Sequence, residues 1–254
     1  MYTPQGQGRM QVRIGGPLTP VVKALLIANA AIYLFTVIPV MIGSQGGTEV
    51  VANIVYYLGM TPAVFWGDLT LWMPITYMFL HSLASPMHVL FNMLALWMFG
   101  GDVEKVFGAR QFAVYYLFCG IGAGLLVAML QPGLGIPTIG ASGAIYGIII
   151  AFGLFFPERV ILMGLLFPIK AKYFVMIIGA IVFFSSLGGP GGEISHVAHL
   201  GGFVFGFFYI KRHKIWRWFG ALLSRRRKPK LRVIDTEKLR RLLEDDDSDD
   251  HVVH

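Results

Sequence analysis

The 254-residue sequence contains little charge, since Asp, Glu, Lys and Arg together make up only 14% of it. Soluble domains typically carry about 25% charged residues. The shortage is greatest before Lys211, because only 14 of the 35 charged side chains lie in the first 210 residues. A soluble globule of that size could not cover its surface with so few charges, so a soluble domain is excluded.

Cysteine is equally scarce, because Cys119 is the only one and lies in an apolar run, which excludes a disulfide scaffold. Zinc-ligand spacings, phosphate-binding loops and nucleic-acid stacking motifs are missing, so we expect no metal, no cofactor and no nucleic-acid partner. The opening residues 1–16 are polar and glycine-rich, and we expect no cleavable signal peptide there.

The sequence does contain long apolar segments. Six segments approach the ~20 residues that a helix needs to cross a bilayer. They are residues 20–42, 83–100, 111–130, 139–156, 173–187 and 194–210. Lipid offers no partners for backbone polar groups, and the alternation of a barrel strand is absent, so these segments must be helices. The sequence therefore predicts an all-α membrane protein with a six-transmembrane-helix bundle.

The basic residues orient these segments. Every Lys and Arg lies before or at the start of the first segment, between the second and third, between the fourth and fifth, or after the sixth. The other three connections contain only acidic charges, which are Glu49, Asp68 and Glu193. Because basic connections stay on the cytoplasmic side, both termini are predicted to be cytoplasmic.

This pattern divides the chain into three parts: a cytoplasmic N-terminal segment (1–19), a six-span domain (20–211) and a cytoplasmic tail (212–254). In the tail we expect an interfacial helix at 214–223, a basic cluster at 225–230 and a solvated acidic run at 244–250. The first outer connection, residues 43–80, is rich in apolar and aromatic side chains, so it is predicted to lie on or partly in the outer leaflet.

Polar groups at membrane depth are costly, and each one is therefore a candidate functional residue. Three such motifs lie in the second, fourth and sixth segments: His88-x-x-x-Asn92, Gly140-x-Ser142-Gly143-x-x-Tyr146-Gly147 and His199-x-x-Gly202 with Gly206 following. The helix rise of ~1.5 Å per residue places all three roughly 8–12 Å below the outer face. This shared depth indicates one common site.

The residue types at this depth suit acyl transfer. A serine hydroxyl such as that of Ser142 becomes nucleophilic when a neighbouring base, here His199, takes its proton. His88, Asn92 and the backbone N–H of Ser142 are candidate donors to the oxyanion that forms. Gly140 and Gly143 would let a substrate backbone approach.

The glycine pairs Gly143/Gly147 and Gly202/Gly206 would let the fourth and sixth spans pack closely and bring Ser142 against His199.

Each motif also has a purely structural interpretation. Ser142 could cap its helix, and His88 with Asn92 could form a hydrogen bond between helices. We interpret His196 as a snorkelling or capping residue, and Tyr77 and His81 as loop or interface residues. Only the shared depth favours the catalytic interpretation of Ser142 and His199.

In this order and in alternate spans, the three motifs resemble those of the rhomboid family of intramembrane serine proteases. The similarity extends over residues 66–209 and includes Gly100-Gly101-x-x-Glu104 with Gly108. By position, the resemblance implies that Ser142 is the nucleophile, His199 the general base, His88 and Asn92 the oxyanion donors, and Tyr146 the residue packed under the imidazole.

The resemblance implies a Ser-His dyad that hydrolyses peptide bonds in or beside transmembrane segments of membrane-protein substrates. The alternative is a catalytically silent rhomboid-like binding factor. A proton-relay transporter is disfavoured, because the inner halves of the spans are apolar. We expect a multi-pass protein of a bacterial inner membrane, whose active site opens to the outside. The sequence indicates neither the substrate nor the oligomeric state.

Overall fold

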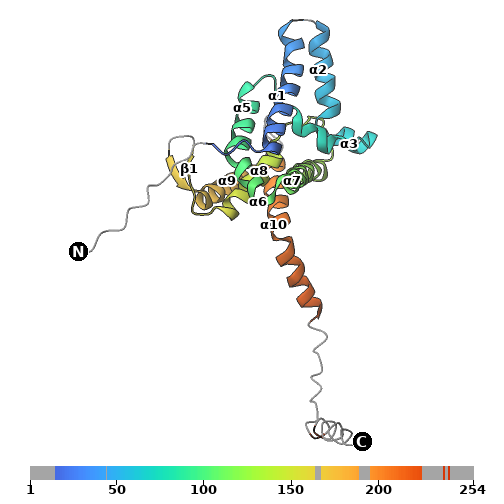
Figure 1. The fold of residues 1–254 in the computed structure, drawn as a ribbon. Helices are drawn as coiled ribbons and strands as arrows, with labels where there is room; N and C mark the ends of the chain where they lie inside the picture. Colours follow the sequence, from blue (N-terminus) through green and yellow to red (C-terminus); the bar gives the residue numbers. More distant parts are fainter. Residues whose placement is uncertain are drawn as a thin grey trace, which may run out of the picture. The chain divides into compact units, whose positions relative to one another are not determined.

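The computed structural model describes residues 15–43, 45–163, 167–188 and 195–224, together with Glu237 and Arg240. It is predominantly helical (Figure 1), and its contacts divide the chain into two units, Met1–Lys211 and Arg212–His254. The helices that contain the six predicted spans are α1 (Pro20–Met41), α5 (Pro86–Ala95) with the π-helical turn η2 (Leu96–Gly100), α7 (Ala109–Leu130), α8 (Ser142–Phe155), α9 (Ala171–Ser186) and α10 (His196–Ser224). A further helix, α6 (Gly101–Phe107), continues directly from η2.

Two of the described helices, α1 and α7, are long and apolar enough to cross a membrane by length and composition, with 22 residues each. The apolar helices α8 and α9 are shorter, with 14 and 16 residues. The described part of the chain is therefore a mostly helical fold with two clear apolar spans, and the six-span arrangement and the orientation of the termini stay predictions.

The structure differs from the all-α prediction in the connection between α8 and α9. Strands β1 (Val160–Met163) and β2 (Phe167–Lys170) form an antiparallel hairpin in which Val160 pairs with Lys170. Both strands are short and rich in branched or aromatic apolar residues, which favour extended backbone. The prediction overlooked the hairpin because an apolar run of this length gives no helical or strand periodicity.

The end of α10 also differs from the prediction. The predicted interfacial helix at 214–223 is the continuation of α10, which runs unbroken to Ser224, because no proline interrupts this stretch. The predicted N-terminal segment up to residue 14, the basic cluster at 225–230 and the acidic run at 244–250 lie outside the described residues.

The long connection between α1 and α5 is folded rather than extended. It contains α2 (Gln45–Leu58), α3 (Pro62–Asp68), α4 (Met73–Thr76) and the 3-10 turn η1 (Tyr77–Phe79). Proline occupies one of the first two positions of α1, α3, α4 and α5, where its fixed φ suits a helix start and its missing N–H costs nothing. Local sequence therefore sets where these helices begin.

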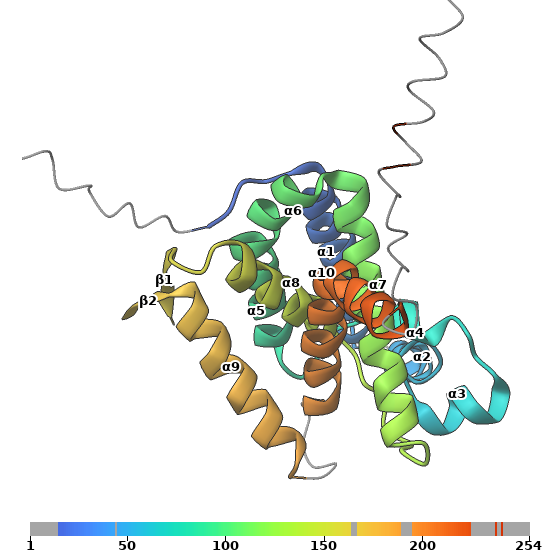
Figure 2. The same cartoon turned by 90° about the horizontal axis from the view of Figure 1, so that it is seen from below.

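Helix α8 is the centre of the first unit. It contacts α7, α9, α5, α6 and η2, and Figure 2 shows it between α5 and α7. Glycines on α7 make room for side chains from neighbouring elements: Gly120 faces Met78, Gly122 faces Phe205 and Gly124 faces Tyr77. The first turn of α8 is thus enclosed by packed helices.

A single buried carboxylate joins the start of α1 to α6. Glu104 is only 3% exposed, and it accepts the backbone N–H groups of Val21 and Val22 at 3.1 and 2.9 Å and the hydroxyl of Thr19 at 2.5 Å. These donors belong to the first turn of α1, which has no partners within its own helix. Glu104 therefore caps a helix that begins more than 80 residues earlier, where the helix dipole also favours a negative charge.

We expect Glu104→Gln to destabilise the fold, because the amide directs an N–H₂ group toward backbone donors and leaves one of them unpaired. The cost should be about 1–3 kcal/mol of unfolding free energy, seen as a lower melting temperature in detergent. The matched control is Glu158→Gln, which removes an exposed carboxylate that pairs only with Lys170 and Lys172. Equal melting temperatures for the two variants would contradict the capping role.

Candidate active site

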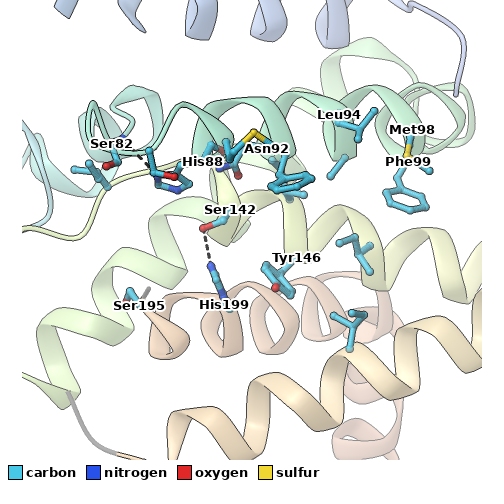
Figure 3. A pocket seen from close by; sticks show the side chains of 18 of the residues that line it. Ser82, His88, Asn92, Leu94, Met98, Phe99, Ser142, Tyr146, Ser195 and His199 are labelled. Carbon is cyan, nitrogen blue, oxygen red and sulfur yellow. Dashed lines mark hydrogen bonds between the residues drawn. The ribbon is translucent and has the colours of Figure 1, made fainter. Parts of the chain in front are cut away.

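Two residues from separate helices meet at the centre of the predicted site. Ser142 is the first residue of α8, and His199 lies in the first turn of α10. The His199 Nε2 atom and the Ser142 Oγ atom are 2.8 Å apart, a hydrogen-bond distance (Figure 3). This is the separation that a nucleophile and its base require for proton transfer.

Glycine contacts between α8 and α10 allow this approach. A Cβ atom added at Gly202 would overlap the carbonyl oxygen of Gly143, and one added at Gly206 would lie 2.9 Å from the Cα atom of Gly147. A side chain at Gly202 or Gly206 would therefore push the two helices apart, whereas one at Gly143 or Gly147 would first clash with Ala123 or Cys119 of α7. The structure thus brings the two predicted glycine pairs together at one interface.

Tyr146 lies one turn after Ser142 and supports the imidazole. Its ring stacks on that of His199, with 4.3 Å between the ring centroids and 23° between the planes. Offset stacking at this separation is favourable and restricts the rotation of the histidine ring. Tyr146 therefore fixes the direction in which His199 Nε2 faces Ser142.

His88 and Asn92 lie on the side of Ser142 opposite His199 (Figure 3). The backbone N–H of Ser82 donates to His88 Nδ1 at 3.4 Å. In a neutral imidazole the other nitrogen, Nε2, then carries the proton and is a donor. The Asn92 amide donates one hydrogen to the His88 carbonyl at 2.8 Å, which leaves its second hydrogen for another acceptor.

Gly140 lies directly in front of these two donors. A Cβ atom at this position would be 2.7 Å from His88 Nε2 and 3.9 Å from Asn92 Nδ2. Its φ of +118° also lies in a region that favours glycine. The backbone of Gly140 thus occupies a place that no residue with a side chain could take.

The predicted site lines a cavity of about 720 Å³ between α5 on one side and α8 and the first half of α9 on the other. At one end the lining includes the polar side chains of Ser82, Ser85, Thr138 and Ser195 around Ser142, His199, His88 and Asn92. At the other end it is apolar and consists of Ala95, Met98, Phe99, Ile161, Leu162 and Phe174. The cavity therefore joins a polar site to an apolar groove.

His81 lies in the loop between η1 and α5, as expected, and Tyr77 opens the turn η1 in the same connection; what the sequence did not indicate is that both side chains are buried. His81 is 2% exposed, and its ring lies 5.2 Å from that of His88. Burial, together with the nearby His88, lowers the pKa of His81 to about 4, so its ring is neutral at pH 7. Tyr77 is 1% exposed and is packed beside the start of α8. No local sequence signal distinguishes such residues from exposed ones, because only tertiary packing buries them.

Among the described residues, no group of three or more His, Cys, Asp or Glu side chains is arranged to hold a metal ion. The ion pairs in that same part of the chain join Arg159 to Asp102 and Glu158 to Lys170 and Lys172, and none involves His199. Glu193, the acidic residue nearest to His199 in the sixth segment, lies outside the described residues. The described lining of the cavity around Ser142 and His199 includes no Asp, Glu, Lys or Arg.

Comparison with known proteins identifies the family. Residues 68–213 match the Rhomboid domain, and the chain belongs to the rhomboid family, whose members are integral membrane proteins. It is 33% identical over 128 residues to Rhomboid protein 1, mitochondrial, of Saccharomyces cerevisiae, an alignment that covers 48% of this chain and 36% of the yeast protein.

Two further relatives show a similar level of identity. Rhomboid protease GluP of Bacillus subtilis is 33% identical over 129 residues, covering 48% of this chain and 22% of GluP. Presenilin-associated rhomboid-like protein, mitochondrial, of Mus musculus is 32% identical over 143 residues, covering 52% of this chain and 37% of the mouse protein. The chain thus matches well under half the length of each of these relatives.

We expect Gly140→Ala to destabilise the protein by about 1–3 kcal/mol, because alanine is strained at this φ and its methyl group would clash with His88. Thermal melting in detergent measures the loss. Gly135→Ala is the control, since Gly135 lies in the same connection, has an ordinary φ and has no atoms near its Cβ position. Similar melting temperatures for both variants would show that Gly140 is not constrained as described.

Proposed function

We propose that this protein is an intramembrane serine protease in which Ser142 is the nucleophile and His199 the general base. The 2.8 Å separation of Ser142 Oγ and His199 Nε2 is the observation that carries the proposal. His199 would take the hydroxyl proton as Oγ attacks a peptide carbonyl, and would return it to the leaving amine. Water, deprotonated by the same imidazole, would then hydrolyse the acyl-enzyme and restore Ser142.

The attack places negative charge on the former carbonyl oxygen. His88 Nε2–H, the free hydrogen of Asn92 and the backbone N–H of Ser142 would donate to it, and all three lie around Gly140. Ser142 is in the first turn of α8, where N–H groups lack intrahelical partners and the dipole favours an anion. Donors fixed before the reaction stabilise such charge without reorganisation.

The cavity suggests the class of substrate. Its apolar end, between α5 and α9, suits the side chains of a transmembrane segment. Its polar end suits the unwound backbone that must reach Ser142, and it can also admit the water that hydrolysis needs. We therefore propose membrane proteins as substrates, with cleavage in or beside a membrane-spanning segment. The name of the relative GluP, a rhomboid protease, supports proteolysis as the reaction.

We propose that the six helical segments all span the membrane and that both termini are cytoplasmic, which the distribution of Lys and Arg supports. The site would then open to the outer face. Two of the relatives named above are mitochondrial by their names and one is from a bacterium. They do not support the predicted bacterial inner membrane in particular, so the proposal extends only to a multi-pass membrane location.

The alternative is a silent rhomboid-like protein that binds membrane proteins without cleaving them. It would use the same cavity but would need neither the hydroxyl nor the imidazole. Both groups are present here, face each other at hydrogen-bond distance, and are supported by Tyr146. That arrangement favours the protease.

We expect Ser142→Ala and His199→Ala each to abolish cleavage of a model transmembrane substrate and labelling by a fluorophosphonate, with little change in melting temperature. His196→Ala is the control: His196 is three positions earlier on α10, its ring is 6.2 Å from that of His199, and much of the activity should remain. Cleavage by Ser142→Ala at the rate of the unchanged chain would exclude the proposed mechanism. Binding of substrate without cleavage by the unchanged chain would favour the silent protein.

We expect Asn92→Ala to lower kcat by roughly 10²–10³ while the apparent KM changes only a few-fold, because the lost donor acts on charge that exists only in the transition state. Slow fluorophosphonate labelling should persist, since Ser142 and His199 are unchanged. The competing role is structural, because Asn92 is buried and bonded within α5. A large fall in melting temperature, with activity lost only in proportion to unfolded protein, would support that role instead.

A further inference from the structure

The segment that leads into Ser142 is held at two points by the folded outer connection. Met60 and Thr138 exchange backbone hydrogen bonds of 2.8 and 2.9 Å. Two residues further on, the Gly140 N–H donates to the carbonyl oxygen of Tyr77 at 2.9 Å. The second bond acts on the residue that faces His88 Nε2 and lies two positions before the proposed nucleophile.

The side chain of Tyr77 is itself fixed between two helices. Its hydroxyl donates to the Gly120 carbonyl of α7 at 2.7 Å. Its ring fills the space beside Gly124 of α7, where an added Cβ would lie 2.9 Å from Cε1, and its oxygen would be 3.0 Å from a Cβ at Gly143 of α8. One buried residue thus contacts α7, the first turn of α8 and the Gly140 peptide.

We propose that Tyr77 is a positioning residue for Ser142. The hydroxyl bond to α7 fixes the ring, and the ring fixes the backbone of η1. The carbonyl of Tyr77 then holds Gly140 so that the Gly140–Ser142 turn faces His88 and Asn92. This inference rests on the proposed function, since it concerns the same nucleophile. It adds Tyr77, which would act on Ser142 only through the residues that it contacts.

Tyr77 is not proposed as a catalytic residue. It is absent from the lining of the cavity, and its hydroxyl is bonded to the carbonyl of Gly120 on α7. A loss of this hydroxyl should therefore act on the placement of Gly140 and Ser142 rather than on substrate binding. Displacements of about 1 Å at a reacting group can reduce rates by up to about 10²-fold.

Tyr115 provides a matched control. Like Tyr77, it is fully buried, and its hydroxyl donates to a glycine carbonyl on another helix, that of Gly147 at 2.5 Å. Gly147 lies five residues after Ser142, beyond the first turn of α8. Tyr77→Phe and Tyr115→Phe each remove one buried hydroxyl of the same kind, but only the first is connected to Gly140.

The experiment compares these two variants in the full-length protein in detergent. We expect similar falls in melting temperature for both. Tyr77→Phe should lower kcat and the rate of fluorophosphonate labelling by about tenfold or more with little change in apparent KM, whereas Tyr115→Phe should stay close to the unchanged chain. Hydrogen exchange of the Gly140 amide, which needs no activity, should be faster in Tyr77→Phe alone.

Unchanged kcat and unchanged Gly140 exchange in Tyr77→Phe would overturn the positioning role. Equal losses of kcat in both variants, in proportion to their melting temperatures, would also overturn it, because they would indicate general destabilisation. A failure of the proposed function looks different: the unchanged chain would then show no cleavage and no labelling at Ser142.

Discussion

The arrangement of the site depends on the close packing of α8 against α10. Because Gly143 and Gly147 meet Gly202 and Gly206 without side chains between them, the backbones approach until Ser142 and His199 share a hydrogen bond. In lipid there is no hydrophobic force to press helices together, so small residues that permit van der Waals contact and backbone proximity decide which helices pair. A larger side chain at Gly202 or Gly206 would separate Ser142 from His199.

Two further parts of the structure fix the surroundings of Ser142: the connection between α1 and α5, and helix α5 itself. The outer connection supplies Met60 and Tyr77, which fix the turn before α8, and α5 supplies His88 and Asn92. Helix α5 continues through a π-helical turn into α6, and there Glu104 caps α1. The carbonyl of Trp97 in that turn also accepts the Gly16 N–H at 3.0 Å. Backbone N–H groups at and before the start of α1 thus find partners in distant segments, as buried polar groups require.

The sequence alone predicted those helices and site residues that apolar composition or motif spacing marks. Apolar length located the long helices, and spacing placed His199, Ser142 and Tyr146 where the structure brings them together. Spacing failed where burial depends on tertiary packing: Tyr77 looks like any aromatic residue of an outer loop, yet α7 and α8 enclose it. The β1–β2 hairpin was also missed, because eight of the eleven residues 160–170 are apolar, and such a run shows neither a helical nor a strand period.

Polar side chains gather around Ser142 at one end of the bundle, and aromatic rings pack at the other end. Around Ser142 the cavity is lined by hydroxyls, an amide and imidazoles. Ten or more residues further along α8, ~15 Å away, aromatic rings fill the space: Phe152 packs on Phe99 with centroids 5.0 Å apart, and Phe155 packs on Phe107 at 5.2 Å. In this part of the described bundle, aromatic rings thus take the place of the polar side chains found around Ser142. This division supports the proposed hydrolysis, which needs water to reach one layer, over the transporter alternative, which would need polar groups through the full depth.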